Sequence, residues 1–187
     1  MATTEIRITG FGGQGVILAA YVIGKAAAVM EGRHATLNQS FGPEARGSAC
    51  SAQLILSDEP VTYPYVRQTD ILLAMSQDAY RQYVGEVREQ GIILIDDSLV
   101  TRDSAHRTFG APATRTAEKL GKKIVANMVM VGLFTSTTNV IQRDAARKAI
   151  QTSVPSGTEE LNLAAFDRGL DLGDGLVAPS SREQASV

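Results

Sequence analysis

The sequence predicts a single α/β domain built on a doubly wound, mainly parallel sheet with helices on both faces. Strand-like runs alternate with helical segments along most of the chain, which is the order that parallel strands with crossover helices require. A glycine-rich turn joins the first strand to the first helix, as in a βαβ unit. The length of 187 residues suits one domain with a full core.

The glycine turn follows a strand at residues 6–9 and opens an apolar helix at residues 16–30. Its G-x-G-x-x-G spacing is that of a dinucleotide-binding turn, which would make the fold Rossmann-like. The turn is nearly bare of side chains, so its N–H groups suit an anion. The alternative is a turn that only packs the helix tightly against the strand. The candidate anion-binding residues are Gly10, Gly12, Gly13, Gln14 and Gly15.

A dinucleotide also needs an acidic residue at the tip of the second strand, about 20 residues further on, to hold the ribose. That strand is expected at residues 34–38, and it ends in Asn38, Gln39 and Ser40 without a carboxylate. Glu31 has nearly the right spacing but belongs to the end of the first helix. Bound NAD or FAD is therefore disfavoured, and a self-contained dinucleotide-dependent oxidoreductase stays open as an alternative.

The segment at residues 39–47 reads as an irregular loop at the carboxyl edge of the second strand. Phe41 would be an apolar anchor, Pro43 would hold the loop extended, and Arg46, oriented by Glu44, would offer paired donors to a phosphate or carboxylate. The alternative is a solvated connection with a surface ion pair. The candidate interface residues of this loop are Ser40, Phe41, Gly42, Pro43, Glu44, Arg46 and Gly47.

The middle of the chain predicts three more strands. Cys50 falls in a strand at residues 48–56, which an edge strand or extended connection at residues 61–66 follows. Ser76 is expected to cap a helix at residues 77–90. Buried strands are expected on either side of that helix, at residues 70–75 and 91–97. Asp96 and Asp97 end the second of these strands, and we expect them to cap the turn rather than bind a metal.

The C-terminal part is mainly helical. Asn127 is expected to cap one of these helices, and Glu159 and Glu160 lie in or just before the first turn of the last one. Residues 1–172 should form the domain, and residues 173–187 a mobile tail. The expected elements are helices at residues 111–120, 128–137, 143–152 and 161–170, and a short strand at residues 122–126.

Composition excludes several classes of function. A net charge of −2, without a Lys/Arg-rich block, argues against nucleic acid and anionic membranes as partners. The apolar run at residues 16–30 is too short and polar for a membrane span, and no signal peptide is recognised. One cysteine, Cys50, excludes a disulfide framework and an all-cysteine iron–sulfur cluster, and it suits a reducing cytoplasm.

No catalytic residue and no metal site emerge from the sequence. His34 and His106 lack metal-ligand spacing, and there is neither a nucleophile elbow nor a P-loop lysine. The stretch Gly173-Asp174-Gly175 begins like a thiamine-diphosphate motif, but no asparagine follows it in the rest of the chain.

Four stretches together resemble the γ subunit, or γ domain, of the 2-oxoacid:ferredoxin oxidoreductases. The likeness covers about residues 5–170, and the loop is its most specific part. Ser48 departs from the second glycine that is common there, but serine is small and begins a strand. The stretches are residues 8–16 (ITGFGGQGV), 39–47 (QSFGPEARG), 75–80 (MSQDAY) and 126–132 (ANMVMVG).

The resemblance implies a cytoplasmic hetero-oligomer that converts a 2-oxoacid and coenzyme A to an acyl-CoA and carbon dioxide, passing electrons to ferredoxin. Thiamine diphosphate with Mg²⁺ and the iron–sulfur clusters would lie in other subunits, so this chain alone would bind no cofactor. Its partners would be α and β subunits and a ferredoxin-like subunit or ferredoxin. The glycine turn would contact the coenzyme A side, and Asn127 would join the loop at the interface.

The loop and residues 76–80 look more like 2-oxoglutarate-type enzymes than those acting on pyruvate, branched-chain 2-oxoacids or indolepyruvate. Three hypotheses follow from the sequence. The chain is a subunit of an enzyme complex, a self-contained dinucleotide-dependent oxidoreductase, or a binding module without enzymatic activity. Only the first accounts for the motifs together with the missing cofactor ligands.

Overall fold

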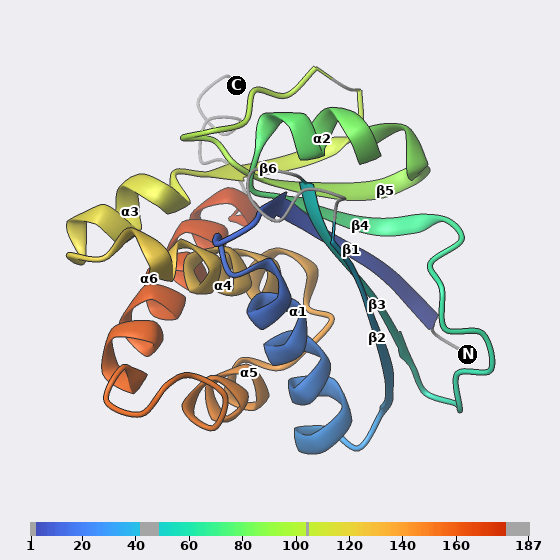
Figure 1. Ribbon diagram of the computed structural model, residues 1–187, viewed down its shortest axis with the longest axis horizontal. Helices are drawn as coiled ribbons and strands as arrows, with labels where there is room; N and C mark the ends of the chain where they lie inside the picture. Colours follow the sequence, from blue (N-terminus) through green and yellow to red (C-terminus); the bar gives the residue numbers. More distant parts are fainter. Residues whose placement is uncertain (1–2, 42–48, 104, 179–187) are drawn as a thin grey trace, which may run out of the picture.

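The computed structural model describes residues 3–41, 49–103 and 105–178. They form one six-stranded sheet with the strand order β2-β3-β1-β4-β5-β6 and helices on both faces (Figure 1). The predicted α/β class is therefore confirmed. The strands are β1 (Thr3–Phe11), β2 (His34–Phe41), β3 (Ala49–Ser57), β4 (Thr69–Ala74), β5 (Val87–Asp96) and β6 (Arg107–Ala111).

The described part of the chain contains nine helical elements. Six are α-helices: α1 (Val16–Lys25), α2 (Gln77–Tyr83), α3 (Ala113–Lys119), α4 (Ala126–Thr138), α5 (Arg143–Gln151) and α6 (Glu159–Val177). The π-helical segment η1 (Ala26–Met30) continues α1, and the single 3₁₀ turns are η2 (Val84–Glu86) and η3 (Lys123–Val125). No helix of the described residues is long and apolar enough to cross a membrane.

The sheet is mixed because β3 runs antiparallel to both of its neighbours, β1 and β2. The pairs β1–β4, β4–β5 and β5–β6 are parallel. Five strands therefore point the same way, and their carboxyl ends share one edge, called the carboxyl edge below. The crossover from β1 through α1 to β2 skips one position, and β3 fills it.

Each face of the sheet has its own core. On one face, Leu72 and Ile93 of the sheet pack with Tyr80 of α2 and with Val100. The other face carries the larger core, to which α1, α4, α5 and α6 contribute (Figure 1). Nearly all of α4 is buried, because the sheet covers one side of it and α6 the other. A helix without a polar face fits this central position.

Two glycines set the closeness of α4 and α6. A Cβ on Gly132 would lie 2.1 Å from the carbonyl oxygen of Phe166, and a Cβ on Gly169 would lie 2.0 Å from that of Val129. Real Cβ atoms essentially never approach other heavy atoms closer than 3.0 Å. The two helix backbones are therefore in direct contact, and only glycine allows it at either position.

Three sequence predictions are wrong at the level of secondary structure. The helix expected at residues 77–90 ends at Tyr83, because Gly85 weakens it and Val87 instead pairs with Thr69 as the start of β5. The strand expected at residues 122–126 is the turn η3 and the start of α4. The strand beside β5 is β6, where no strand was predicted.

Other boundaries shift by less. Residues 61–66 form an extended connection and not a strand, held where the Val66 N–H donates to Gln53 Oε1 at 2.9 Å. The last helix begins with Glu159 and Glu160 in its first turn, as expected, and runs to Val177. The predicted start of a mobile tail at residue 173 is therefore wrong for residues 173–177, while residues 179–187 lie outside the described part.

Candidate functional site

The glycine turn lies at the carboxyl edge, and the side chain of Gln14 fills its inner side. Gln14 Oε1 accepts a hydrogen bond from the N–H of Phe11 at 2.6 Å, and its Nε2 donates to the carbonyl oxygen of Met75 at 2.8 Å. A Cβ on Gly10 would lie 2.5 Å from that same Oε1. Position 10 therefore requires glycine, because the Gln14 side chain occupies the space that a Cβ would need. The N–H of Phe11 is already hydrogen-bonded to Gln14 and is not available to a ligand.

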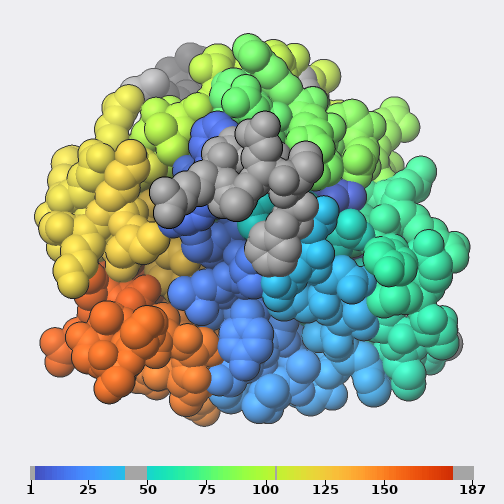
Figure 2. Space-filling model, in the orientation of Figure 1, coloured from blue at the N-terminus to red at the C-terminus, as the bar shows by residue number. Residues whose placement is uncertain are grey.

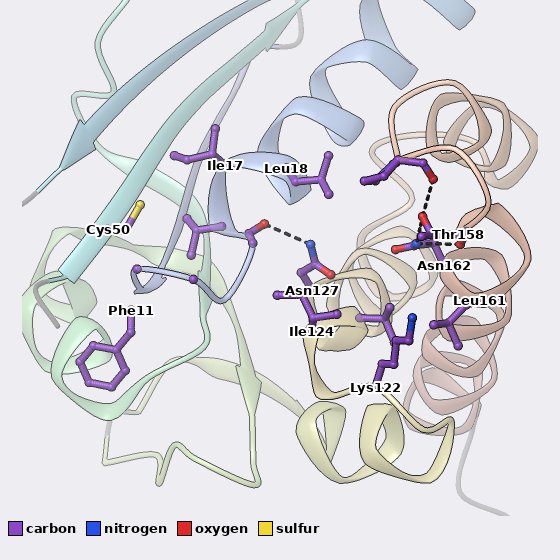
Figure 3. Close-up of a pocket in the computed structure, with 16 residues that line it drawn as sticks. Phe11, Ile17, Leu18, Cys50, Lys122, Ile124, Asn127, Thr158, Leu161 and Asn162 are labelled. Carbon is purple, nitrogen blue, oxygen red and sulfur yellow. Dashed lines mark hydrogen bonds between the residues drawn. The ribbon is translucent and has the colours of Figure 1, made fainter. Parts of the chain in front are cut away.

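The last glycine of the motif packs against α4. Gly15 has a left-handed conformation with φ of 75°, and a Cβ there would lie 2.3 Å from Asn127 Nδ2. Asn127 donates from that nitrogen to the carbonyl oxygen of Gly15 at 3.2 Å (Figure 3). The prediction that Asn127 caps α4 is wrong: Val125 is the N-cap, and Asn127 lies within the first turn. Its amide ties α4 to the turn before α1.

Gly12 and Gly13 remain open, since a Cβ on either would meet nothing within 4 Å. They line a cavity of about 430 Å³ between the glycine turn, α1 and the start of α6 (Figure 3). Apolar side chains such as Ile17, Leu18 and Leu161 form most of its wall. The full lining is Phe11, Gly12, Gly13, Gly15, Val16, Ile17, Leu18, Cys50, Lys122, Ile124, Val125, Asn127, Pro155, Thr158, Leu161 and Asn162.

A second cavity, of about 270 Å³, lies on the other side of the turn and shares Gly13 and Ile124 with the first. Lys122 lines the first cavity and Lys123 the second, and both lysines are exposed. Each cavity is therefore lined by glycine backbone that no side chain covers and by one lysine ammonium group, and this combination suits an anionic ligand. Neither lysine was predicted at this site, because both were expected in a strand at residues 122–126.

The predicted interface loop begins beside this turn. Phe41, the last residue of β2, and Gly10 of β1 are both in register with Cys50 of β3. With neighbouring strands about 4.8 Å apart, the end of β2 lies roughly 10 Å from the glycine turn. Ser40 is exposed and pairs with Ser51. The other predicted interface residues of the loop, Gly42, Pro43, Glu44, Arg46 and Gly47, lie outside the described residues.

Cys50 lies in a strand, as predicted, and lines the back of the first cavity. It is 7% exposed, and burial raises the pKa of its thiol above the ordinary value of 9.0. The thiolate is the reactive form, so this thiol is a weak nucleophile at neutral pH.

Asp96 is a buried structural carboxylate. Its Oδ1 accepts from the N–H of Ser98 at 3.1 Å, and its Oδ2 accepts from the N–H and the hydroxyl of Thr114 at 3.0 and 2.5 Å. The prediction that it caps a turn is confirmed, and it also holds the start of α3. Asp97 is exposed, and its pKa is raised by desolvation and by neighbouring Asp96, against a lowering effect of Arg115.

The described residues do not fit the cofactors of a 2-oxoacid oxidoreductase. Asp174 lies within α6, where its carboxylate accepts from Ser136 Oγ at 2.6 Å and from Arg143 Nη1 at 3.0 Å, so the Gly-Asp-Gly stretch is helical and already engaged. No three His, Cys, Asp or Glu side chains of the described residues come together as metal ligands. A single cysteine cannot supply the four thiolates of an iron–sulfur cluster.

Relatives of the chain carry consistent names. A 2-oxoglutarate synthase subunit KorC from Methanothermobacter marburgensis is 49% identical over 177 residues, covering 90% of this chain and 95% of that protein. The subunit KorC from Methanocaldococcus jannaschii is 44% identical, with 90% and 92% covered. The ketoisovalerate oxidoreductase subunit VorA from Methanothermobacter marburgensis is 33% identical, but the match spans only 36% of its length.

Solved structures agree in fold. The γ subunit of a keto/oxoacid ferredoxin oxidoreductase from Geobacter sulfurreducens superposes with a TM-score of 0.81 at 38% identity, covering 91% of this chain and 98% of that one. A chain of the 2-oxoglutarate:ferredoxin oxidoreductase from Magnetococcus marinus gives 0.84 at 20% identity, covering 96% of this chain and 32% of that one. At that identity the likeness concerns the fold alone.

A family model described as pyruvate ferredoxin/flavodoxin oxidoreductase matches residues 5–172. The match includes the glycine turn, both cavities and the contact between α4 and α6. The resemblance inferred from the four sequence stretches is confirmed, and the chain belongs to the pyruvate ferredoxin/flavodoxin oxidoreductase family.

Proposed function

We propose that this chain is the γ subunit of a 2-oxoglutarate:ferredoxin oxidoreductase complex. The complex would convert 2-oxoglutarate and coenzyme A to succinyl-CoA and carbon dioxide while reducing ferredoxin. The observation that carries the proposal is the 44–49% identity to three 2-oxoglutarate synthase subunits over about 90% of the chain. Relatives named for other substrates are more distant, at 33% for ketoisovalerate and 31% for pyruvate.

The chain would act as a structural partner and not as the site of decarboxylation. The described residues contain neither a metal-ligand cluster nor a reactive thiol, which supports a division of labour among subunits. The partners would be α and β subunits and a ferredoxin-like subunit or ferredoxin, assembled in the cytoplasm. Thiamine diphosphate, Mg²⁺ and the iron–sulfur clusters would be held by those partners.

A self-contained dinucleotide-dependent oxidoreductase is the alternative of another class, and the sheet order argues against it. In a dinucleotide-binding fold, the second parallel strand lies directly beside the first and holds the ribose at its tip. Here β3 occupies that place and runs antiparallel. In addition, Gln14 occupies part of the glycine turn.

The experiment is co-expression of this chain with candidate α, β and ferredoxin-like subunits. We expect a stable complex that reduces a viologen dye with 2-oxoglutarate and coenzyme A, but not with pyruvate, and no turnover by the isolated chain. Calorimetry of the isolated chain with NAD(H), NADP(H) and FAD tests the alternative. Oxidation of a 2-oxoacid by the isolated chain, or micromolar dinucleotide binding, would contradict the proposal.

We also propose that the glycine turn and the loop at residues 39–47 face coenzyme A or another subunit. Open backbone at Gly12 and Gly13, with Lys122 beside it, supports an anionic group at the turn. A charge-assisted contact by Arg46 would contribute about 1.5–3 kcal/mol. Arg46→Ala should therefore weaken assembly or raise the KM for coenzyme A by about tenfold or more, with the melting temperature of the isolated chain unchanged. Wild-type assembly and kinetics would rule out this role.

A further inference from the structure

The two edges of the sheet differ in how well they are protected against another strand. An edge strand presents a row of unpaired N–H and C=O groups, and proteins usually block it with charges, proline, bulges or short length. β2 and β6 are the edge strands of this sheet among the described residues.

β2 carries none of these protective features. Its sequence, HATLNQSF, contains no proline, lysine, arginine or carboxylate. All eight residues pair with β3 in one unbroken register without a bulge. One face of the strand is anchored, since Ala35 and Leu37 pack on the larger core. β2 is therefore a regular strand, and none of the residues that the structure describes pairs with its outer edge; β2 faces the viewer in Figures 1 and 2.

β6, at the opposite edge, is better protected. It has five residues, and its first, Arg107, places a guanidinium 4.9 Å from the centre of the Phe109 ring. A short strand with a charged side chain over its exposed end is a poor template for pairing. The two edges of the sheet therefore differ, and β2 is the one without these protective features.

An exposed aromatic cluster lies near β2, over β1 and β3, where Tyr63 and Tyr65 share a hollow with Glu5 and Ile55. Tyr63 and Tyr65 are 48% and 53% exposed, with ring centroids 5.7 Å apart, and the Arg67 guanidinium lies 4.3 Å from the Tyr63 centroid. The segment that carries them rests against β2, where Asn38 Nδ2 donates to the carbonyl oxygen of Pro64. Tyrosine and arginine are enriched at the centres of protein interfaces.

We propose that an extended strand of a larger subunit of the complex pairs with the open edge of β2, and that Tyr63 and Tyr65 pack against the same subunit. In one relative and in one structure of similar fold, the matched part makes up only 36% and 32% of a longer chain, so there it is joined to further polypeptide. That arrangement favours a different polypeptide over a second copy of this chain. The inference rests on the proposed function, because it requires the chain to be a subunit.

Hydrogen exchange on the active complex tests the pairing directly. In an antiparallel edge strand every second N–H points outward, so in the isolated chain these amides of β2 should exchange fast. In the complex they should slow by about tenfold or more, while the outward amides of β6 keep their rate. An active complex whose β2 amides exchange as in the isolated chain would overturn this inference and leave the proposed function intact.

A concentration-dependent slowing in the isolated chain would also overturn the inference, since it would identify a second copy as the partner. Failure to assemble, or an inactive assembly, would instead count against the proposed function. These outcomes are distinguishable because activity and exchange are measured on the same sample.

Proline substitution separates strand pairing from simple burial. Gln39 and Ser40 are adjacent and exposed, so one of their N–H groups bonds to β3 and the other points outward. The proline variant that keeps the melting temperature of the isolated chain identifies the outward N–H. That variant should weaken assembly by tenfold or more relative to its matched alanine control, Gln39→Ala or Ser40→Ala. Equal assembly of every proline variant and its alanine control would overturn the inference.

Discussion

The contact between α4 and α6 predicts that adding one methyl group at Gly169 strongly destabilises the chain. The methyl carbon of Gly169→Ala would lie 2.0 Å from the carbonyl oxygen of Val129, and that oxygen belongs to the backbone of a buried helix. Ordinary contact begins at 3.4 Å, so the helices must separate locally by 3.4 − 2.0 = 1.4 Å or more. No rotamer change can relieve this clash.

The magnitude follows from two opposing effects. Overpacking of a well-packed core costs about 1–3 kcal/mol, and a rigid backbone neighbour places this site near the upper end. Replacing glycine by alanine within a helix returns roughly 0.5–1 kcal/mol. The net loss is about 2 kcal/mol. In a protein of this size, this loss lowers the melting temperature by about 4–8 °C.

The same helix supplies a matched control. Gly175 also lies in α6, is exposed, and a Cβ there would meet nothing within 4 Å. Gly175→Ala should leave the melting temperature unchanged or raise it by up to about 4 °C. Calorimetry or circular dichroism of both variants measures the difference. If Gly169→Ala melts at or above the wild-type temperature, the close approach of α4 and α6 is wrong.

Three further predictions concern buried and paired groups. Thr114→Val removes the hydroxyl that donates to buried Asp96 and should lower the free energy of unfolding by about 1–3 kcal/mol in urea titration; an unchanged midpoint would contradict this. Burial raises the pKa of the Cys50 thiol above 9.0, so Cys50 should be alkylated more slowly at pH 8 in the folded chain than in urea. The folded state should also lose stability as the pH rises above 9.0, because the unfolded chain then releases the thiol proton more readily. Hydrogen bonding from Arg143 lowers the pKa of Asp174 below 3.8. The difference in melting temperature between wild type and Arg143→Gln should therefore be present near neutral pH and shrink as the pH falls below 3.8. A difference that stays constant with pH would refute the pairing.

Sequence patterns correctly predicted those helices and strands that form mainly through interactions between residues close in sequence. The strand before the glycine turn, the apolar helix after it and the Ser76 cap all follow from periodicity and capping chemistry, and the Ser76 hydroxyl accepts from the Ala79 N–H at 3.4 Å. The strand β6 was missed because its sequence, RTFGA, is short and half polar. It forms a strand because it pairs with the backbone of β5, and β5 is available for pairing only once the sheet has folded.

In the candidate site, too, the sequence predicted the local features but not the contacts between distant parts of the chain. Spacing identified the five residues of the glycine turn, but it could not show that Gln14 folds back over Gly10 or that Asn127 reaches Gly15 across 112 positions of sequence. Lys122 and Lys123 were placed in a strand because their neighbours are β-branched. Their position beside the turn depends on how η3 connects α3 to α4, for which the sequence gives no local signal.

The insertion of β3 between β1 and β2 also constrains the order in which the chain can fold during synthesis. Thr3 pairs with Ser57, so β1 and β2 gain no ladder until residues 49–57 have left the ribosome. Once they emerge, three strands and α1 can form one antiparallel unit, and β4 can join only afterwards, where Ile6 meets Ile71. Loop closure of this kind slows folding. We therefore expect the three-stranded N-terminal unit to form only after residue 57 has left the ribosome, and the parallel part of the sheet to be added to it later.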